Sequence, residues 1–159
     1  MRPSPVDRLF QFAYRGAYLM MRVYWRLRRP STHGSLVAVW HDQRLLLVRN
    51  SYVPYYSLPG GYVKADETGR DAAVRELSEE IGLRVDPDML SLALSENHEW
   101  EQKHERIEIF ELESQEAPRV EVDHREVVDA AFFSPESALK LDLFPPIRTV
   151  IERRLARRN

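Results

Sequence analysis

Residues 61–83 read GYVKADETGRDAAVRELSEEIGL and carry the most informative spacing in the chain. Residues 68–81 predict a helix, because Thr68 followed three residues later by Asp71 has the spacing of a capping box. On a helical wheel, three carboxylates share one face of this helix and apolar side chains occupy the other. The carboxylates belong to Glu76, Glu79 and Glu80, and the apolar side chains to Val74, Leu77 and Ile81.

Three carboxylates on one helix face repel one another, which raises their pKa values unless a cation lies beside them. Mg²⁺ and Mn²⁺ are hard cations that prefer oxygen ligands, so they are natural partners for this face. The Gly60-Gly61 turn before the helix offers free backbone carbonyls and lets a ligand approach closely. Arg75 lies one turn before Glu79 and can pair with it. From the helix alone, a solvated acidic face paired with arginines stays open as the alternative.

The spacing of the whole segment points to a known family. Gly61, Glu67 and the run 75–83 occupy every specified position of the Nudix box, so the chain resembles the Nudix hydrolase family. The resemblance extends more loosely over residues 35–145. It implies an α/β fold, a Nudix-like α/β/α sandwich with a mixed sheet. We expect this domain over residues 31–159 and, within residues 1–30, an extra amphipathic N-terminal helix that the minimal fold does not require.

The resemblance also implies an activity. It predicts a hydrolase of phosphoric anhydride bonds that uses Mg²⁺ or Mn²⁺ to cleave a nucleoside diphosphate linked to another moiety. By position, Glu76 and Glu80 resemble the main metal ligands, and Glu79 resembles a further ligand or the catalytic base. The carbonyl of Gly60 resembles a backbone ligand, and Arg75 resembles a residue that orients a carboxylate. Glu67 is similar to a residue near the metals. One further acid outside the box is implied, with Glu96, Glu99, Glu101, Glu105 and Glu126 as candidates.

Aromatic residues near the expected cleft are candidates for stacking on a nucleotide base. Tyr55 and Tyr56 precede the turn that leads into the box. Trp100 lies in the polar segment 96–104, which we interpret as a loop between strands that contributes to specificity. These three are the candidate substrate-binding residues, and Trp40 and Tyr52 are further ones. Ordinary packing is the alternative for each.

Residues 5–29 predict a long helix that is apolar around most of its circumference. One seam follows a 3-4-3-4-3 spacing and consists of Phe10, Ala13, Ala17, Met20, Tyr24 and Leu27. Arg8, Arg15, Arg22 and Arg29 repeat every seven residues. A helix this apolar needs cover. We expect the seam to face its own domain or a second copy in a homodimer, in preference to a membrane surface. Catalysis is not expected to require the helix directly.

Short apolar runs separated by turn residues predict the strands that accompany these helices. The predicted strands are 36–40, 45–48, 90–95, 106–112 and 127–133, and residues 57–61 predict a turn. Helices are expected from Ser134, whose next residue is a proline, and from Phe144, which is followed by two.

Composition bounds the remaining possibilities. The chain has 159 residues, the size of one ordinary domain, and no cysteine, which excludes disulfides, zinc ribbons and thiol nucleophiles. Residues 51–147 carry twenty-two acidic and nine basic side chains, which argues against a nucleic-acid binder. No apolar run is long enough for a membrane span or signal peptide, so we expect a cytoplasmic protein.

Two classes of function follow from these observations. The first is the hydrolase. The second is a nucleotide-sensing or regulatory binding module that keeps the fold without significant turnover. The intact set of Glu67, Arg75, Glu76, Glu79 and Glu80 weighs against loss of catalysis.

Overall fold

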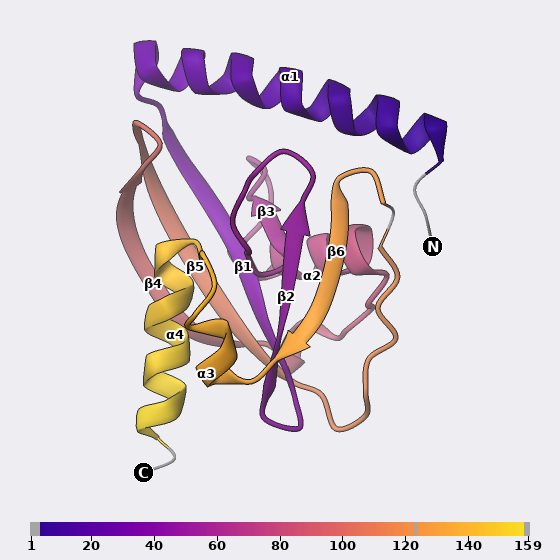
Figure 1. The fold of residues 1–159 in the computed structure, drawn as a ribbon. Helices are drawn as coiled ribbons and strands as arrows, with labels where there is room; N and C mark the ends of the chain where they lie inside the picture. Colours follow the sequence, from indigo (N-terminus) through magenta and orange to yellow (C-terminus); the bar gives the residue numbers. More distant parts are fainter. Residues whose placement is uncertain (1–3, 123, 158–159) are drawn as a thin grey trace.

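The computed structural model of the protein describes residues 4–122 and 124–157. Its strands form one mixed sheet. The strands of this sheet are β1 (Ser31–His41), β2 (Arg44–Asn50), β3 (Gly60–Tyr62), β4 (Ser91–Trp100), β5 (Lys103–Glu113) and β6 (Val127–Phe133). Their order is β4-β5-β1-β2-β6, and β3 pairs with β1 (Figure 1). The pair β1–β5 is parallel and the other pairs are antiparallel.

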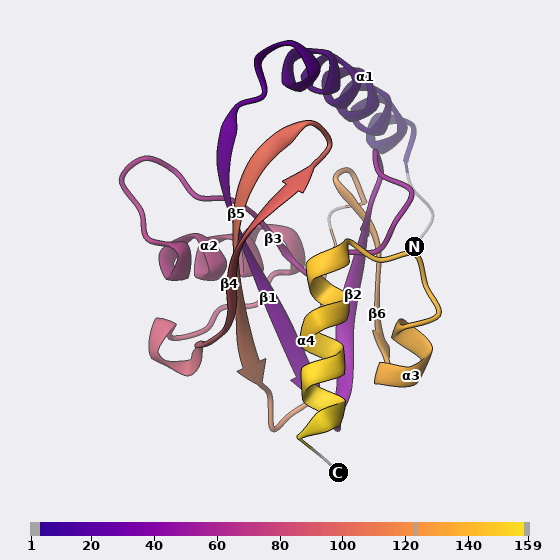
Figure 2. The same cartoon turned by 90° about the vertical axis from the view of Figure 1, so that its left-hand side faces the viewer.

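Helices cover both faces of this sheet, as Figure 2 shows for α2 and α4. The helical elements are α1 (Pro5–Arg28), α2 (Gly69–Ile81), the 3₁₀ turn η1 (Pro87–Met89), α3 (Pro135–Ala138) and α4 (Pro145–Ala156). Apolar side chains of α4 and of α2 pack into two separate cores, one on each side of the sheet. The α/β/α sandwich and the extra N-terminal helix predicted from the sequence are therefore confirmed.

The central strand β1 shows why its apolar run is continuous. Leu36, Ala38 and Trp40 point into the core beneath α4, and Val37 and Val39 point into the core beneath α2. A strand covered on both faces has no solvent side and therefore needs no polar alternation. Trp40 has no exposed surface, so the interpretation of this residue as a base-stacking platform is wrong.

The segment 96–104 is not the loop that its polar composition suggested. It forms the end of β4, a two-residue turn at Glu101 and Gln102, and the start of β5, with Trp100 paired to Lys103. Both turn residues have positive φ, as tight hairpin turns require. The charged residues Lys103 and Glu105 are buried on the inner face. Because polar residues occupy inward-facing positions at the end of β4 and the start of β5, the hydrophobicity pattern does not predict strands there. The last two residues of the predicted turn at 57–61 belong instead to the short strand β3.

The helix α1 packs on the domain through a different face from the predicted seam. Gln11, Tyr14, Tyr18 and Trp25 lie on the packed side, while Met20, Tyr24 and Leu27 of the seam are exposed. Because α1 is apolar nearly all round, its periodicity does not decide which arc packs. Polar contacts help to decide it: Gln11 donates to the carbonyl of His124 at 2.7 Å, and Arg15 to that of Ser51 at 2.9 Å.

No helix in the described parts of the chain is long and apolar enough to cross a membrane.

Candidate active site

The helix α2 brings the acidic residues of the box to the edge of one cavity. Thr68 and Asp71 form the predicted capping box at its start, and Gly82 ends it in a left-handed conformation. The cavity has a volume of about 630 Å³, within the usual range for small-molecule sites. The predicted metal and catalytic residues that line it are Gly60, Arg75, Glu76, Glu79 and Glu80.

Two glycines allow the backbone of β3 to approach the carboxylates of α2. Gly60 has φ of 148°, and a Cβ there would lie 2.2 Å from the Ser35 carbonyl oxygen. Its backbone N–H donates to Glu80 Oε2 at 2.8 Å. A Cβ on Gly61 would lie 2.5 Å from Glu76 Oε1. A side chain at either position would therefore displace the wall of the cavity.

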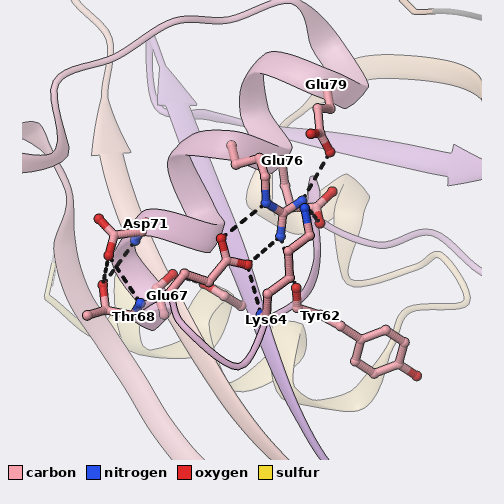
Figure 3. A network of polar contacts seen from close by, with 10 residues as sticks. Tyr62, Lys64, Glu67, Thr68, Asp71, Glu76 and Glu79 are labelled. Atoms are coloured by element: carbon pink, nitrogen blue, oxygen red, sulfur yellow. Dashed lines mark hydrogen bonds and ion pairs between the residues drawn. The ribbon is translucent and has the colours of Figure 1, made fainter.

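The guanidinium of Arg75 connects three carboxylates, those of Glu67, Glu76 and Glu79, which are labelled in Figure 3. It donates to Glu67 at 2.7 Å, to Glu76 at 2.6 Å and to Glu79 at 3.0 Å. A fourth contact, to the Tyr62 carbonyl, measures 3.0 Å. One cation thus offsets much of the repulsion among the acids and fixes their orientation.

The carboxylates differ in their electrostatic environment. Hydrogen bonds from Arg75, and then from the Lys64 backbone, lower the pKa of Glu67 to about 2. Burial raises the pKa of Glu76 above its ordinary value, although Arg75 acts in the opposite direction. The side chain of Glu79 is 58% exposed. Only 8% of the surface of Glu80 is exposed to solvent, so the acidic face of α2 is not uniformly solvated.

The donor set has the chemistry that a hard divalent cation requires, because carboxylates from α2 line one cavity. Among the residues described, however, no three His, Asp or Glu side chains stand in a metal-binding arrangement. The physical reason is visible in the contacts: Arg75 holds Glu76 and Glu79, while Glu80 accepts from Gly60. To bind a cation, Glu76 and Glu79 would have to turn from Arg75 toward the cavity.

The structure separates the candidates for a further acid. Glu101, Glu105 and Glu126 line the cavity, and Glu96 and Glu99 are not among its lining residues. Glu105 is paired with Lys103 at 2.8 Å, and Glu101 accepts a hydrogen bond from Tyr18.

Glu126 differs from these two because its charge acts on the box itself. It is one of the groups whose charge raises the pKa of Glu76. It also accepts a hydrogen bond from the Tyr52 hydroxyl at 2.9 Å. Glu126 therefore lines the cavity and its charge acts on Glu76, which favours it as the further acid.

Two of the three candidate substrate-binding aromatics come together. Tyr55 and Trp100 line the cavity, with ring centroids 5.9 Å apart in an edge-to-face arrangement. Tyr56 is not among the lining residues: its ring packs against Phe133 at 5.6 Å, and its hydroxyl lies 3.3 Å from Asp129.

The wall of the cavity opposite α2 includes residues that the sequence reasoning missed. They come from α1 and are Tyr14, Ala17, Tyr18, Met21 and Trp25. Trp25 is buried, and the ammonium of Lys103 lies 4.5 Å from the centroid of its ring. The available signal was the spacing of Tyr14, Tyr18 and Trp25, which places three aromatic rings on one helix face. The helix α1 thus forms part of the cavity wall.

Comparisons with known proteins agree with this fold. The NUDIX domain family matches residues 31–154, and the chain therefore belongs to the Nudix family. The crystal structure of the MutT NUDIX hydrolase from Burkholderia pseudomallei superposes with a TM-score of 0.68 and 22% identity, covering 77% of this chain and 96% of that one. At this identity the likeness supports the fold alone.

Curated relatives match over shorter segments. A protein named putative 8-oxo-dGTP diphosphatase from Bacillus subtilis is 46% identical over 52 residues, which is 32% of this chain and 35% of the relative. An ADP-ribose pyrophosphatase from Methanocaldococcus jannaschii is 42% identical over 45 residues, 26% of this chain and 27% of the relative. The matches thus span about a third of these relatives or less.

Proposed function

We propose that this protein is a divalent-metal-dependent pyrophosphohydrolase that cleaves a nucleoside diphosphate linked to another moiety. The observation that carries the proposal is the group of three acids on α2 that lines one cavity. Arg75, anchored on Glu67, orients Glu76 and Glu79, and the Gly60 N–H holds Glu80. Membership of the Nudix family and relatives named as a diphosphatase and a pyrophosphatase support hydrolysis of a phosphoric anhydride bond.

The proposal assigns separate roles to the carboxylates of α2. Glu76 and Glu80, together with the Gly60 carbonyl, would hold Mg²⁺ or Mn²⁺. When bound, such a cation neutralises the diphosphate and makes a coordinated water more acidic. Glu79 is the most exposed of the three and stands at the cavity, where it can complete the ligand set or accept the proton of the attacking water.

Arg75 acts through the carboxylates that it orients, and we assign it a positioning role. Its contacts with Glu67 anchor the guanidinium on the loop before α2, and its contacts with Glu76 and Glu79 orient these two side chains. A fixed starting geometry reduces the reorganisation that the transition state requires. Glu126, held by the Tyr52 hydroxyl, is the further acid that we add to the site.

The aromatic wall supplies the substrate-binding part of the proposal. Tyr55 and Trp100 offer ring surfaces in the same cavity as the acids, so a base stacked there lies near the cleavage site. Tyr14 and Tyr18 of α1 line the facing side. These rings bear on which nucleotide and which linked group fit. The placement of Tyr56 outside the cavity removes it from our proposed set.

A substrate panel tests this function. The purified full chain is incubated with sugar nucleotides, dinucleoside polyphosphates, dinucleotide cofactors and oxidised nucleoside triphosphates, each with Mg²⁺, with Mn²⁺ or with excess chelator. Products are identified by mass, and ¹⁸O-labelled water identifies the phosphorus that is attacked. We expect metal-dependent release of a nucleoside monophosphate from at least one class. Tight binding without any product would indicate the sensing module instead, and undiminished turnover in chelator would refute the metal mechanism.

A further inference from the structure

The face of α1 that points away from the domain carries large apolar side chains that nothing in the described part of the chain covers. Leu9, Phe12, Leu19, Met20, Val23 and Leu27 are between 55% and 77% exposed. With 100° of rotation per residue, these six side chains fall within an arc of about 100°. A contiguous apolar surface of this kind marks an interaction site in a soluble protein, unlike single exposed apolar residues.

A stripe of arginines runs along one edge of this arc. Arg8, Arg15, Arg22 and Arg26 fall within about 40° of one another on the wheel, directly beside Leu19 and Phe12. The one acid within α1 is Asp7, whose side chain is 17% exposed and paired with Arg125 on the domain side. The outward half of α1 is therefore apolar and basic, with no carboxylate.

We propose that α1 docks on an anionic phospholipid bilayer, lying in the plane of the membrane surface with this outward face in the headgroup region. Charge complementarity favours this occupant. Lipid headgroups supply anions to the arginine stripe while the acyl boundary accepts the apolar arc, the combination that interfacial helices use. A second copy of the helix would supply no carboxylate, because Asp7 is already engaged.

The placement of α1 leaves this face available. The side of the helix that faces the domain is held by Gln11 and Trp25, through contacts with His124 and Lys103. Arg15, in the arginine stripe, donates to the Ser51 carbonyl at the margin of this contact, which leaves Arg8, Arg22 and Arg26 for the lipid headgroups. Figures 1 and 2 show α1 as the outermost element at one end of the molecule, lying across the sheet. Docking therefore uses a surface already formed and requires no unfolding of the domain.

Co-sedimentation with vesicles tests the proposal on the full chain. Vesicles of phosphatidylcholine alone are compared with vesicles containing phosphatidylglycerol, at low and high salt. We expect the protein to pellet with the anionic vesicles, to bind neutral vesicles at least tenfold more weakly, and to dissociate as salt rises. Absence of pelleting with any vesicle overturns the proposal.

Two variants separate the contributions. The apolar variant, which removes the apolar contact, is Leu19→Gln/Met20→Gln/Leu27→Gln. The basic variant, which removes positive charge and leaves Arg15 unchanged, is Arg8→Gln/Arg22→Gln/Arg26→Gln. Each is expected to lower anionic-vesicle affinity at least tenfold. The matched control Arg84→Gln/Arg119→Gln/Arg157→Gln makes the same charge change away from α1 and should bind as the unmodified chain does. An equal loss of vesicle affinity in this control would show that net charge alone causes the binding, and it would refute the assignment to α1.

Two further readouts keep the outcomes distinct. Circular dichroism confirms that the variants are folded, which we expect because every substituted side chain is exposed. Turnover of a soluble substrate should be unchanged in the apolar variant, so failure of docking does not affect the proposed hydrolase. If light scattering shows a dimer that the apolar variant converts to a monomer, and vesicle binding is absent, a second copy covers α1 and the proposal is wrong.

Discussion

Gly60 donates its backbone N–H to Glu80 Oε2 at 2.8 Å, which ties the start of β3 to the last turn of α2. Two parts of the box twenty residues apart are thereby held at the same cavity. Glu80 is buried at this contact, whereas Glu79 stays exposed. The contact also means that Glu80 has a structural partner beside its proposed metal role, so tests of this residue must preserve a hydrogen-bond acceptor.

Glu80→Gln should reduce turnover by roughly a hundredfold or more, because it removes the charge that the proposed metal site requires. The fold should survive, since the glutamine oxygen can still accept the Gly60 N–H. Steady-state kinetics with Mg²⁺ and a thermal melt check both parts. Glu152→Gln, an exposed change on α4, is the control and should keep full turnover. Near-native turnover of Glu80→Gln would remove this residue from the site.

Glu67→Gln should destabilise the protein at neutral pH but not in strong acid. The folded-state pKa of Glu67 is about 2, below its ordinary value of 4.5. The ionised form is therefore favoured in the folded protein, and its stabilisation is present above about pH 5 and lost as pH falls toward 2. Melting curves in metal-free buffer should show a Tm difference between the two proteins at pH 7 that narrows as the pH is lowered. A difference independent of pH would contradict the assigned cause.

Tyr55→Leu and Tyr56→Leu form a matched pair of neighbouring substitutions. Loss of base stacking is worth about 1–3 kcal/mol, so Tyr55→Leu should raise KM roughly fivefold to a hundredfold. Tyr56→Leu should leave KM nearly unchanged, because its ring packs on Phe133 outside the cavity. Kinetics on the substrate found in the panel measure both. Equal KM effects of the two substitutions would contradict the assignment of substrate stacking to Tyr55 alone.

Trp25→Ala should lower the free energy of unfolding by about 3 kcal/mol, since a buried aromatic side chain and its cation–π contact with Lys103 are lost. Leu27→Ala, two residues on but 77% exposed, should change it by less than about 0.5 kcal/mol. Urea denaturation gives both values. A small effect of Trp25→Ala would show that α1 contributes little to the stability of the domain.

Two sequence-based expectations about the N-terminal region had different outcomes. The helix itself, its start after Ser4 and its end near Arg29 were readable, because capping and the following proline act locally. The packed face was not readable. Tyr18 contacts Glu101 and Trp25 contacts Lys103, about eighty residues away in sequence. Because the helix is apolar nearly all round, its sequence pattern does not predict which face makes these contacts.

The local pattern by itself determined α2, its capping box, its acidic face and the glycine turn before it. These features depend on spacing within one helix and on the backbone of adjacent residues, so residues 61–83 contain all the information needed. The family and its α/β/α fold followed from the same segment.

Tertiary structure alone decided which distant residues share the cavity with α2. Glu126, Trp100 and Tyr18 reach it from β-strand ends, a hairpin and a separate helix, and Tyr56 turns away although it adjoins Tyr55. Strand pairing and the docking of α1 bring these residues together, and both depend on contacts across long sequence separations. The free-energy cost of burying Lys103 and Glu105 is offset by their mutual ion pair. The charged composition of this segment predicts solvent exposure, but the fold places both residues in the inner wall of the cavity.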